Sequence, residues 1–198
     1  MSAVVTQAKS VPKTATSAKK TMSGPISWAD FERKYLSREN RYKYEWVDGE
    51  VVRTLRTMNQ EQQFIWLNLK NFLETLRAQG QNLGELIPEV DTFFSETRHR
   101  RPGIAYFSPE QIAVFRHVNQ VPQFIVEITS NYDQLNKAHQ KLADYRQAGV
   151  PVVWQVFPKT GEVHVYRGKN MAICTGDDPC SAEPVIPGFV LPAAGVFQ

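Results

Sequence analysis

Glu127 is the residue of this sequence whose surroundings suit it least. It stands in the run Phe-Ile-Val-Glu-Ile at 124–128, where every neighbour is apolar. An ionised carboxylate buried without a partner carries a large free-energy cost, so the protein must neutralise it. Three arrangements would do so: an ion pair with a buried lysine or arginine, protonation of the carboxyl group, or a bound divalent cation. The residues alone leave all three open.

Two lysines follow at a spacing that brings them to one side of a helix. Lys137 and Lys141 are four residues apart, so they share a helix face next to an apolar stripe. A helix that packs against the strand of Glu127 would place one of these cations near the acid. In a metal-dependent phosphodiesterase, such a lysine stabilises the charge that grows on phosphorus or orients the attacking water. The alternative is that both lysines are solvated, as lysines on helices usually are.

Hydrophobic periodicity and turn signals predict the elements that would hold these residues. The predicted helices cover about 27–37, 60–79 and 133–149, with a short helical turn at 108–110, and the predicted strands cover about 42–47, 50–55, 86–94, 104–107, 124–129, 152–157 and 162–167. Asp48-Gly49 predicts a tight hairpin turn between the first two strands. This order of elements indicates an α/β fold, a central mixed sheet flanked by helices.

Composition indicates a globular protein without membrane segments. The chain has 198 residues, of which 42% are hydrophobic and 22% charged, as is usual for a folded domain. It contains no apolar run near the roughly 18 residues of a membrane-spanning helix and no secretory signal. Cys174 and Cys180 are too few for a disulfide scaffold and match no usual zinc spacing, so we expect free thiols. We therefore expect a cytoplasmic protein without membrane contact.

The N-terminal segment differs in composition from the rest. Residues 1–25 are rich in Ser, Thr, Ala and Lys and contain no acid, so we expect a disordered tail followed by a single domain over 26–198. Four of the 23 Lys and Arg residues lie in this tail, and the remaining 19 stand against 20 Asp and Glu residues. Any attraction to nucleic acid must therefore come from local patches.

An ordered set of motifs gives the chain a family resemblance. The segments are Tyr-Glu-Trp-Val-Asp-Gly-Glu-Val-Val at 44–52, Phe-Ile-Val-Glu-Ile-Thr-Ser at 124–130, Lys141 to Tyr145, Ala-Gly-Val at 148–150 and Val-Trp at 153–154. In this order and at these separations they resemble the Uma family of bacterial putative restriction endonucleases, in the PD-(D/E)XK nuclease superfamily. The likeness extends over about residues 26–192. It implies a restriction-endonuclease-like core with an N-terminal β-hairpin and helix, and a Mg²⁺ or Mn²⁺ site at one edge of the sheet.

The resemblance also implies roles for individual residues. Glu127 matches a metal-binding glutamate, and Lys141 matches a helix lysine that takes over from the lysine expected at position 129, which here is Thr129. Glu45 matches an acid often found near the metal, although an exposed charge on a hairpin explains it equally well.

One departure weakens the implied metal site. Where the resemblance leads us to expect Pro-Asp, the chain reads Pro102-Gly103, so one metal-binding carboxylate is missing. Magnesium is usually held by one or two carboxylates together with water and substrate phosphate. Asp91 could in principle supply a substitute, with Glu89 on the same strand face. The run Asn-Gln-Glu-Gln-Gln at 59–63 also replaces a histidine that is common in the family, and glutamine cannot act as a general base.

Two basic clusters could contact a phosphate backbone. The first lies next to Gly103, and with the helix lysine it gives the expected DNA contacts Arg98, Arg100, Arg101 and Lys137. The second, over 33–43, is interleaved with acids, so we expect an ordinary solvated face. The resemblance also implies a homodimer. The sequence thus predicts an endonuclease-like protein for phosphodiester hydrolysis with a degenerate site; the alternative is a catalytically inactive DNA- or protein-binding module on the same fold.

Overall fold

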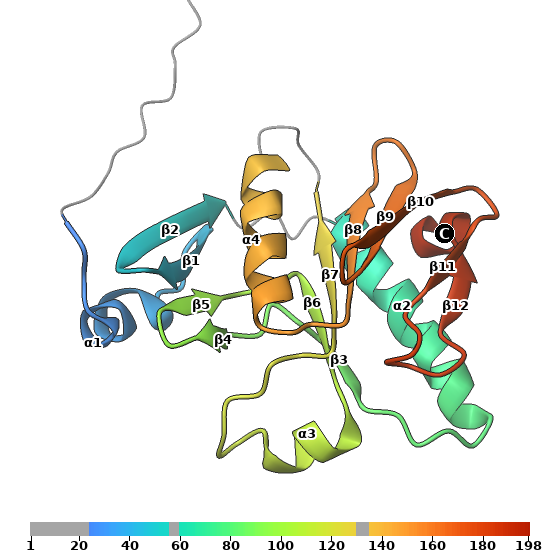
Figure 1. Ribbon diagram of the computed structural model, residues 1–198, viewed down its shortest axis with the longest axis horizontal. Coiled ribbons are helices and arrows are strands. Elements are labelled where there is room, and N and C mark those ends of the chain that lie inside the picture. Colours follow the sequence, from blue (N-terminus) through green and yellow to red (C-terminus); the bar gives the residue numbers. More distant parts are fainter. Residues whose placement is uncertain (1–23, 56–59, 130–134) are drawn as a thin grey trace, which may run out of the picture.

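A mixed six-stranded sheet lies at the centre of the fold (Figure 1). The structure, a computed structural model, describes residues 24–55, 60–129 and 135–198, with the side chains of 135–137 excepted. Side by side, the strands of the sheet are β10 (Asn170–Thr175), β9 (Glu162–Arg167), β8 (Val152–Phe157), β7 (Phe124–Ile128), β6 (Ile104–Phe107) and β3 (Glu85–Pro88). Strands β7 and β8 are parallel, and all other neighbours are antiparallel.

Helices cover both faces of this sheet. Of the helices in the described part of the chain, α2 (Gln60–Ala78) packs on one face and α4 (Leu135–Gln147) on the other. The remaining helices are α1 (Trp28–Phe31), which continues as the π-helical turn η1 (Glu32–Leu36), α3 (Pro109–Val114) and α5 (Ala193–Phe197). Because side chains alternate along a strand, β7 contributes to two cores. Val126 packs in the cluster that contains Leu69 of α2, whereas Ile125 packs with Leu142 of α4. The same alternation assigns Glu127 to the face that α4 covers.

A second sheet of four strands stands beside the first (Figure 1). Its strands, in spatial order, are β2 (Glu50–Leu55), β1 (Tyr42–Val47), β5 (Arg98–Arg100) and β4 (Thr92–Ser95). Asp48 and Gly49 join β1 to β2 with φ angles of 49° and 84°, the positive values that a tight hairpin turn requires. Phe31 of α1 packs under this sheet against Tyr44 and Trp46.

Most of the predicted elements are confirmed. The helix at 27–37, the hairpin and the long helix all form, and the buried strand predicted at 124–129 forms as β7. Ser108 caps α3 with a capping box. The C-terminal region adds the short pair β11 (Pro179–Ser181) and β12 (Val190–Pro192). Cys174 and Cys180 are buried free thiols. Among the described residues, no helix has the length and apolarity needed to cross a bilayer. The predicted tail lies almost entirely outside the described residues.

Two sequence predictions about the middle of the chain are wrong. The segment 86–94 is not one strand but two, β3 and β4, which belong to different sheets. The chain turns between them at Glu89, whose φ is 48°, and the apolar pattern continues across this turn and hides it. The basic run at 98–101 is not part of any predicted strand, but Arg98–Arg100 form β5, which pairs with β1 on one side and β4 on the other.

Candidate functional site

Glu127 is held by two side chains of the helix that covers it. Strand alternation turns Glu127 toward α4, where Lys141 Nζ lies 3.2 Å from its Oε1. The hydroxyl of Tyr145, one turn further along α4, donates a hydrogen bond to the same oxygen. Glu127 is 8% exposed. Of the three arrangements that the sequence left open, the structure contains the ion pair with a buried lysine.

Glu45 reaches the same lysine from the second sheet. Its side chain is fully buried, and its Oε1 lies 2.9 Å from Lys141 Nζ. The backbone N–H of Arg101 donates to the same oxygen at 2.9 Å, and Arg100 lies 3.4 Å from the other oxygen. The alternative that Glu45 is an exposed hairpin charge is therefore wrong. Lys141 bridges two buried carboxylates that come from different sheets.

These cations keep Glu45 ionised. Burial alone would raise the pKa of this carboxyl group. The positive charges of Lys141, Lys43 and Arg100 outweigh burial and lower the pKa to about 2. Burial likewise works against the charged form of Lys141, and its two carboxylate partners outweigh that effect and raise the lysine pKa.

Tyr145 is a site residue that sequence reasoning missed. It enters the sequence analysis only as the end of a family motif, and its ring packs in the core with Leu142. Burial and the neighbouring negative charge of Glu127 raise its pKa well above the usual range, so the hydroxyl stays protonated and donates. The signal was present in the sequence, because Lys141 and Tyr145 are four residues apart and so share a helix face.

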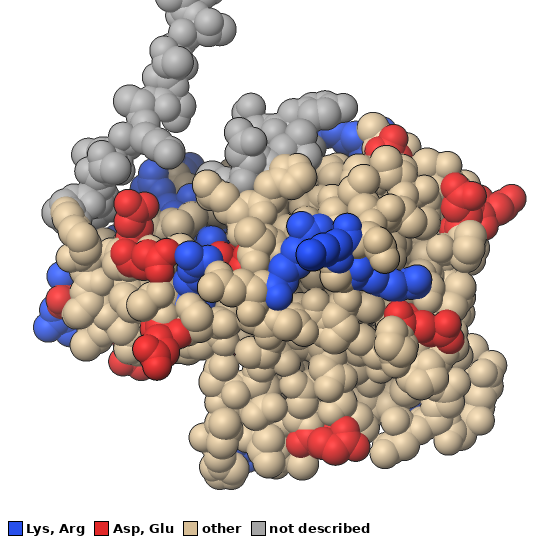
Figure 2. Space-filling model, in the orientation of Figure 1, with Lys and Arg blue, Asp and Glu red and all other residues tan. Residues whose placement is uncertain are grey.

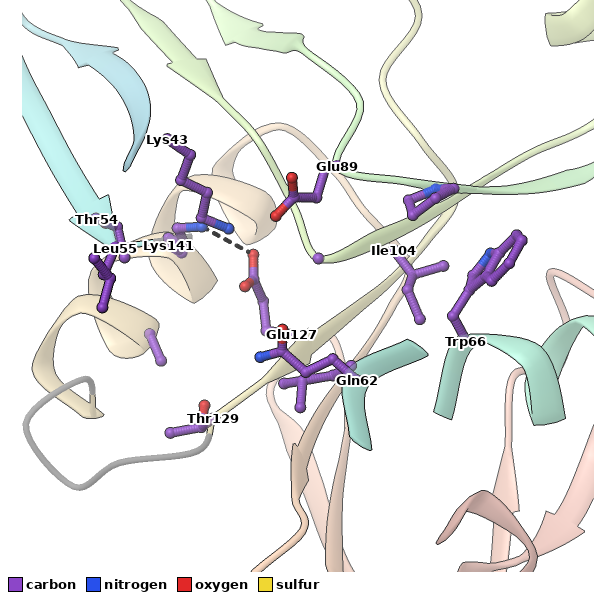
Figure 3. A pocket seen from close by; sticks show the side chains of 14 residues that line it. Lys43, Thr54, Leu55, Gln62, Trp66, Glu89, Ile104, Glu127, Thr129 and Lys141 are labelled. Carbon is purple, nitrogen blue, oxygen red and sulfur yellow. Dashed lines mark hydrogen bonds and ion pairs between the residues drawn. The ribbon is translucent and has the colours of Figure 1, made fainter. Parts of the chain in front are cut away.

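A small pocket opens beside this cluster (Figure 3). Its volume is about 70 Å³, which is room for a few water molecules. The charged residues that line it are Lys43, Glu89, Glu127 and Lys141. Figure 3 shows the carboxylates of Glu127 and Glu89 on the side of the pocket where the two ammonium groups lie. Each ammonium Nζ lies 3.4 Å from the carbonyl oxygen of Arg101.

Gly103 lines the pocket at the position where the resemblance implies an aspartate. A Cβ atom at this glycine would lie 2.9 Å from the carbonyl oxygen of Val126, which is closer than real Cβ atoms come to backbone. The carbonyl of Gly103 in turn accepts a hydrogen bond from the N–H of Glu89 at 3.0 Å. The backbone of β7 leaves no space for a side chain at Gly103, so an aspartate at this position requires a local shift of the backbone.

The structure does not bring Asp91 to Glu127, contrary to the sequence prediction. Arg101 donates to both oxygens of Asp91 through Nε and NH2, at 2.9 and 2.6 Å. His99 Nε2 lies 3.3 Å from Oδ1, and Asp91 is absent from the pocket lining. The physical reason is the turn at Glu89, which breaks the strand alternation expected to place both acids on one face. It is Glu89 that reaches the pocket.

The arginines of the basic run beside Gly103 form ion pairs with carboxylates of the same chain. Arg100 is 5% exposed and donates to Asp144 through Nε and NH2, at 2.8 and 2.5 Å. Arg98 pairs with Asp144 and lies 3.3 Å from Asp48. A buried arginine cannot reach a DNA strand, so the prediction of DNA contact is not supported for Arg100. The side chain of Lys137 lies outside the described residues.

The basic and acidic side chains of the surface are mixed. Figure 2 shows a group of basic side chains near the middle of one face, with acidic side chains spread around it. This face therefore presents no continuous positive surface for a phosphate backbone, in agreement with the charge balance of the chain without its tail.

The residues present do not fit a divalent metal ion well. Within the described part of the chain, no group of three or more His, Cys, Asp or Glu side chains could hold a metal. Oε1 of Glu127 already accepts from Lys141 and Tyr145, and both oxygens of Glu45 face cationic or N–H donors. Gly103 provides no ligand. The described residues of the pocket thus do not provide the donor set of a divalent metal site.

Comparisons with known proteins agree with the predicted family and fold. A family model described as "Uma2: Putative restriction endonuclease" matches residues 28–194. The fold is similar to the crystal structure of a "putative nuclease belonging to DUF820" from Anabaena variabilis, with a TM-score of 0.68 and 18% sequence identity. That match covers 87% of this chain and 98% of the other. No curated protein matches the sequence.

Proposed function

Since this chain belongs to the Uma2 family of putative restriction endonucleases, we propose that its pocket is a degenerate phosphodiester-cleaving centre. The observation that carries the proposal is the environment of Glu127. A carboxylate on a central strand lies 3.2 Å from an ammonium group on the covering helix, and a glycine stands where a second acid is expected. This is the arrangement that we expect of a nuclease centre from which one ligand has been removed.

Lys141 and Tyr145 lie where they could still assist a reaction at a phosphate. Lys141 reaches the pocket from α4, where an ammonium group could stabilise negative charge on a phosphate. Tyr145 fixes the orientation of Glu127 through its hydroxyl. What is missing is negative charge for a metal: two lysines and two glutamates line the pocket. We propose that metal-dependent cleavage of DNA, with Mg²⁺ or Mn²⁺, is lost for this reason.

Plasmid cleavage tests this proposal. Supercoiled plasmid is incubated with the wild-type chain, Glu127→Ala, Gly103→Asp and Gly103→Ala, each with Mg²⁺ or Mn²⁺. We expect wild type and Glu127→Ala to be indistinguishable, and Gly103→Asp to gain nicking that disappears when Glu127→Ala is added. Gly103→Ala is the matched control, because it brings the same steric conflict without a carboxylate. Cleavage by wild type that Glu127→Ala abolishes would contradict the proposal.

The second candidate is a DNA- or protein-binding module without catalysis. The same loss of an acid at position 103 favours it, since binding requires no metal ligand. Fluorescence anisotropy of a labelled duplex at rising salt separates the two uses of the fold, because phosphate contacts weaken steeply with salt. Sedimentation of the same sample tests the proposed homodimer. Neither Arg100 nor Arg101 is included in the proposed DNA contact, because Asp144 and Asp91 occupy their guanidinium groups.

A further inference from the structure

Lys43 is a pocket residue to which neither the motifs nor the family resemblance assigned a role. It lies on β1 two residues before Glu45, so strand alternation turns both side chains to the same face. Figure 3 shows its ammonium group beside that of Lys141, next to the carboxylates of Glu127 and Glu89. Sequence analysis placed Lys43 in a solvated basic cluster, whereas in the structure it is only partly exposed and lines the pocket.

The charge of Lys43 is additional to that of Lys141. Lys141 is the partner of both buried carboxylates, at 2.9 Å from Glu45 and 3.2 Å from Glu127. Lys43 forms no ion pair within the described part of the chain, and its hydrogen bond goes to the carbonyl oxygen of Arg101 at 3.4 Å. The two ammonium groups share that oxygen. A second cation therefore already stands at the site.

The charges that line the pocket cancel. The two glutamates and two lysines that line the pocket sum to zero, and an aspartate at position 103 would have made this sum negative. Glu45 lies behind the lining, where Lys141 and Arg100 both compensate its charge. Divalent cations bind where oxygen ligands carry excess negative charge. Bringing a charge of +2 next to two ammonium groups is unfavourable in a partly buried pocket, where water screens poorly.

We propose that the ammonium group of Lys43 takes the electrostatic place of the divalent cation, so that the pocket excludes metal and is stable without it. The proposal rests on the degenerate centre proposed above, and it names the group that replaces the metal. It also predicts that a single substitution creates a metal site. Without the charge of Lys43, the charged residues that line the pocket are two glutamates and Lys141.

Binding of Mn²⁺ to the full chain, without DNA, tests this inference. Titration calorimetry and the electron paramagnetic resonance signal of free Mn²⁺ measure the affinity. We expect no saturable uptake by wild type at millimolar Mn²⁺, and affinity for one site to rise at least ~10-fold in Lys43→Met. Adding Glu127→Gln to Lys43→Met should remove the new site. Lys34→Met is the matched control, because Lys34 is an exposed lysine paired with Asp30, and it should behave as wild type.

Two results would overturn the inference. One is Mn²⁺ binding by wild type that Glu127→Gln removes, which is decisive even if Lys43→Met does not fold. The other is a folded Lys43→Met or Lys43→Gln that still takes up no Mn²⁺. Because the readout is metal uptake in the absence of DNA, it can fail while plasmid stays uncut, and it can succeed while Gly103→Asp gains no nicking.

Discussion

At the scale of single residues, Lys141 is the group on which the buried charges depend. Its ammonium nitrogen lies within 3.2 Å of carboxylate oxygens from two different sheets. Breaking a buried ion pair by removing one partner is costly because the other charge stays behind without compensation. Here one substitution would leave two carboxylates in that position. The cluster is thus a structural device that holds the two sheets and α4 together.

We predict that Lys141→Met lowers the free energy of unfolding by about 3–5 kcal/mol. Adding Glu127→Gln to Lys141→Met should restore part of the loss, because one of the uncompensated charges is removed. Denaturant unfolding measures all three chains. The exposed control Lys34→Met should change stability by less than about 0.5 kcal/mol. Equal, small effects of both lysine substitutions would show that Lys141 is not the partner of buried charges.

Glu45 gives the cluster a defined pH dependence. Its pKa falls from 4.5 to about 2 on folding, so the native state favours the ionised form. The resulting stabilisation is complete above the unfolded pKa and is lost as the pH drops from about 4.5 towards 2.

We therefore predict that Glu45→Gln costs about 3 kcal/mol of stability near pH 7 and that the difference from wild type vanishes as the pH approaches 2. Denaturant unfolding at a series of pH values measures it. Glu50→Gln, an exposed acid on the other strand of the same hairpin, serves as the control and should show no such pH dependence. A Glu45→Gln penalty that stays constant with pH would refute the explanation by ionisation.

At the scale of elements, backbone contacts between strands decide which side chains fit. Gly84 precedes β3, and a Cβ atom there would lie 1.7 Å from the carbonyl oxygen of Phe107 on β6. Its N–H donates to the hydroxyl of Tyr106 at 3.0 Å. The contact at Gly103 is of the same kind but milder, at 2.9 Å. An added Cβ atom would therefore clash severely at Gly84 and moderately at Gly103, so alanine substitutions at the two positions can be compared.

Gly84→Ala should destabilise the protein by more than about 3 kcal/mol, because strand β3 must move away from β6 to admit the methyl group. Gly103→Ala should cost about 1–3 kcal/mol. Gly24→Ala, where no atom lies within 4 Å of an added Cβ, should be close to neutral. Thermal unfolding of the three variants ranks them, and a neutral Gly84→Ala would show that the β3–β6 approach is looser than described.

What the sequence could predict depends on whether the signal is local. Short stretches of sequence are enough to predict the Asp48-Gly49 turn, the strand around Glu127 and the position of Lys141 on the helix that follows. The structure contains all three. The break at Glu89 was hidden, because the apolar pattern runs across it. The closed space at Gly103 and the place of Lys43 depend on strands that are distant in sequence, so no local pattern could reveal them.

At the scale of the whole molecule, the two sheets meet at the candidate site. Glu45 comes from the four-stranded sheet, Glu127 from the six-stranded sheet, and Lys141 from the helix that covers the latter. Ligand pockets in proteins often form where two structural units meet. In this protein ion pairs from Lys141 to Glu45 and Glu127 connect the two sheets at the junction. We propose that they do so in place of a metal, on a fold that the family shares.

The most direct measurement of that claim is anomalous diffraction from crystals of the full chain soaked in Mn²⁺. The account predicts no anomalous peak within metal–oxygen distance, about 2.0–2.6 Å, of either oxygen of Glu127, and an intact Lys141–Glu127 ion pair. A peak that bridges Glu127 and Glu89, with Lys43 displaced, would contradict the account and identify a working metal centre.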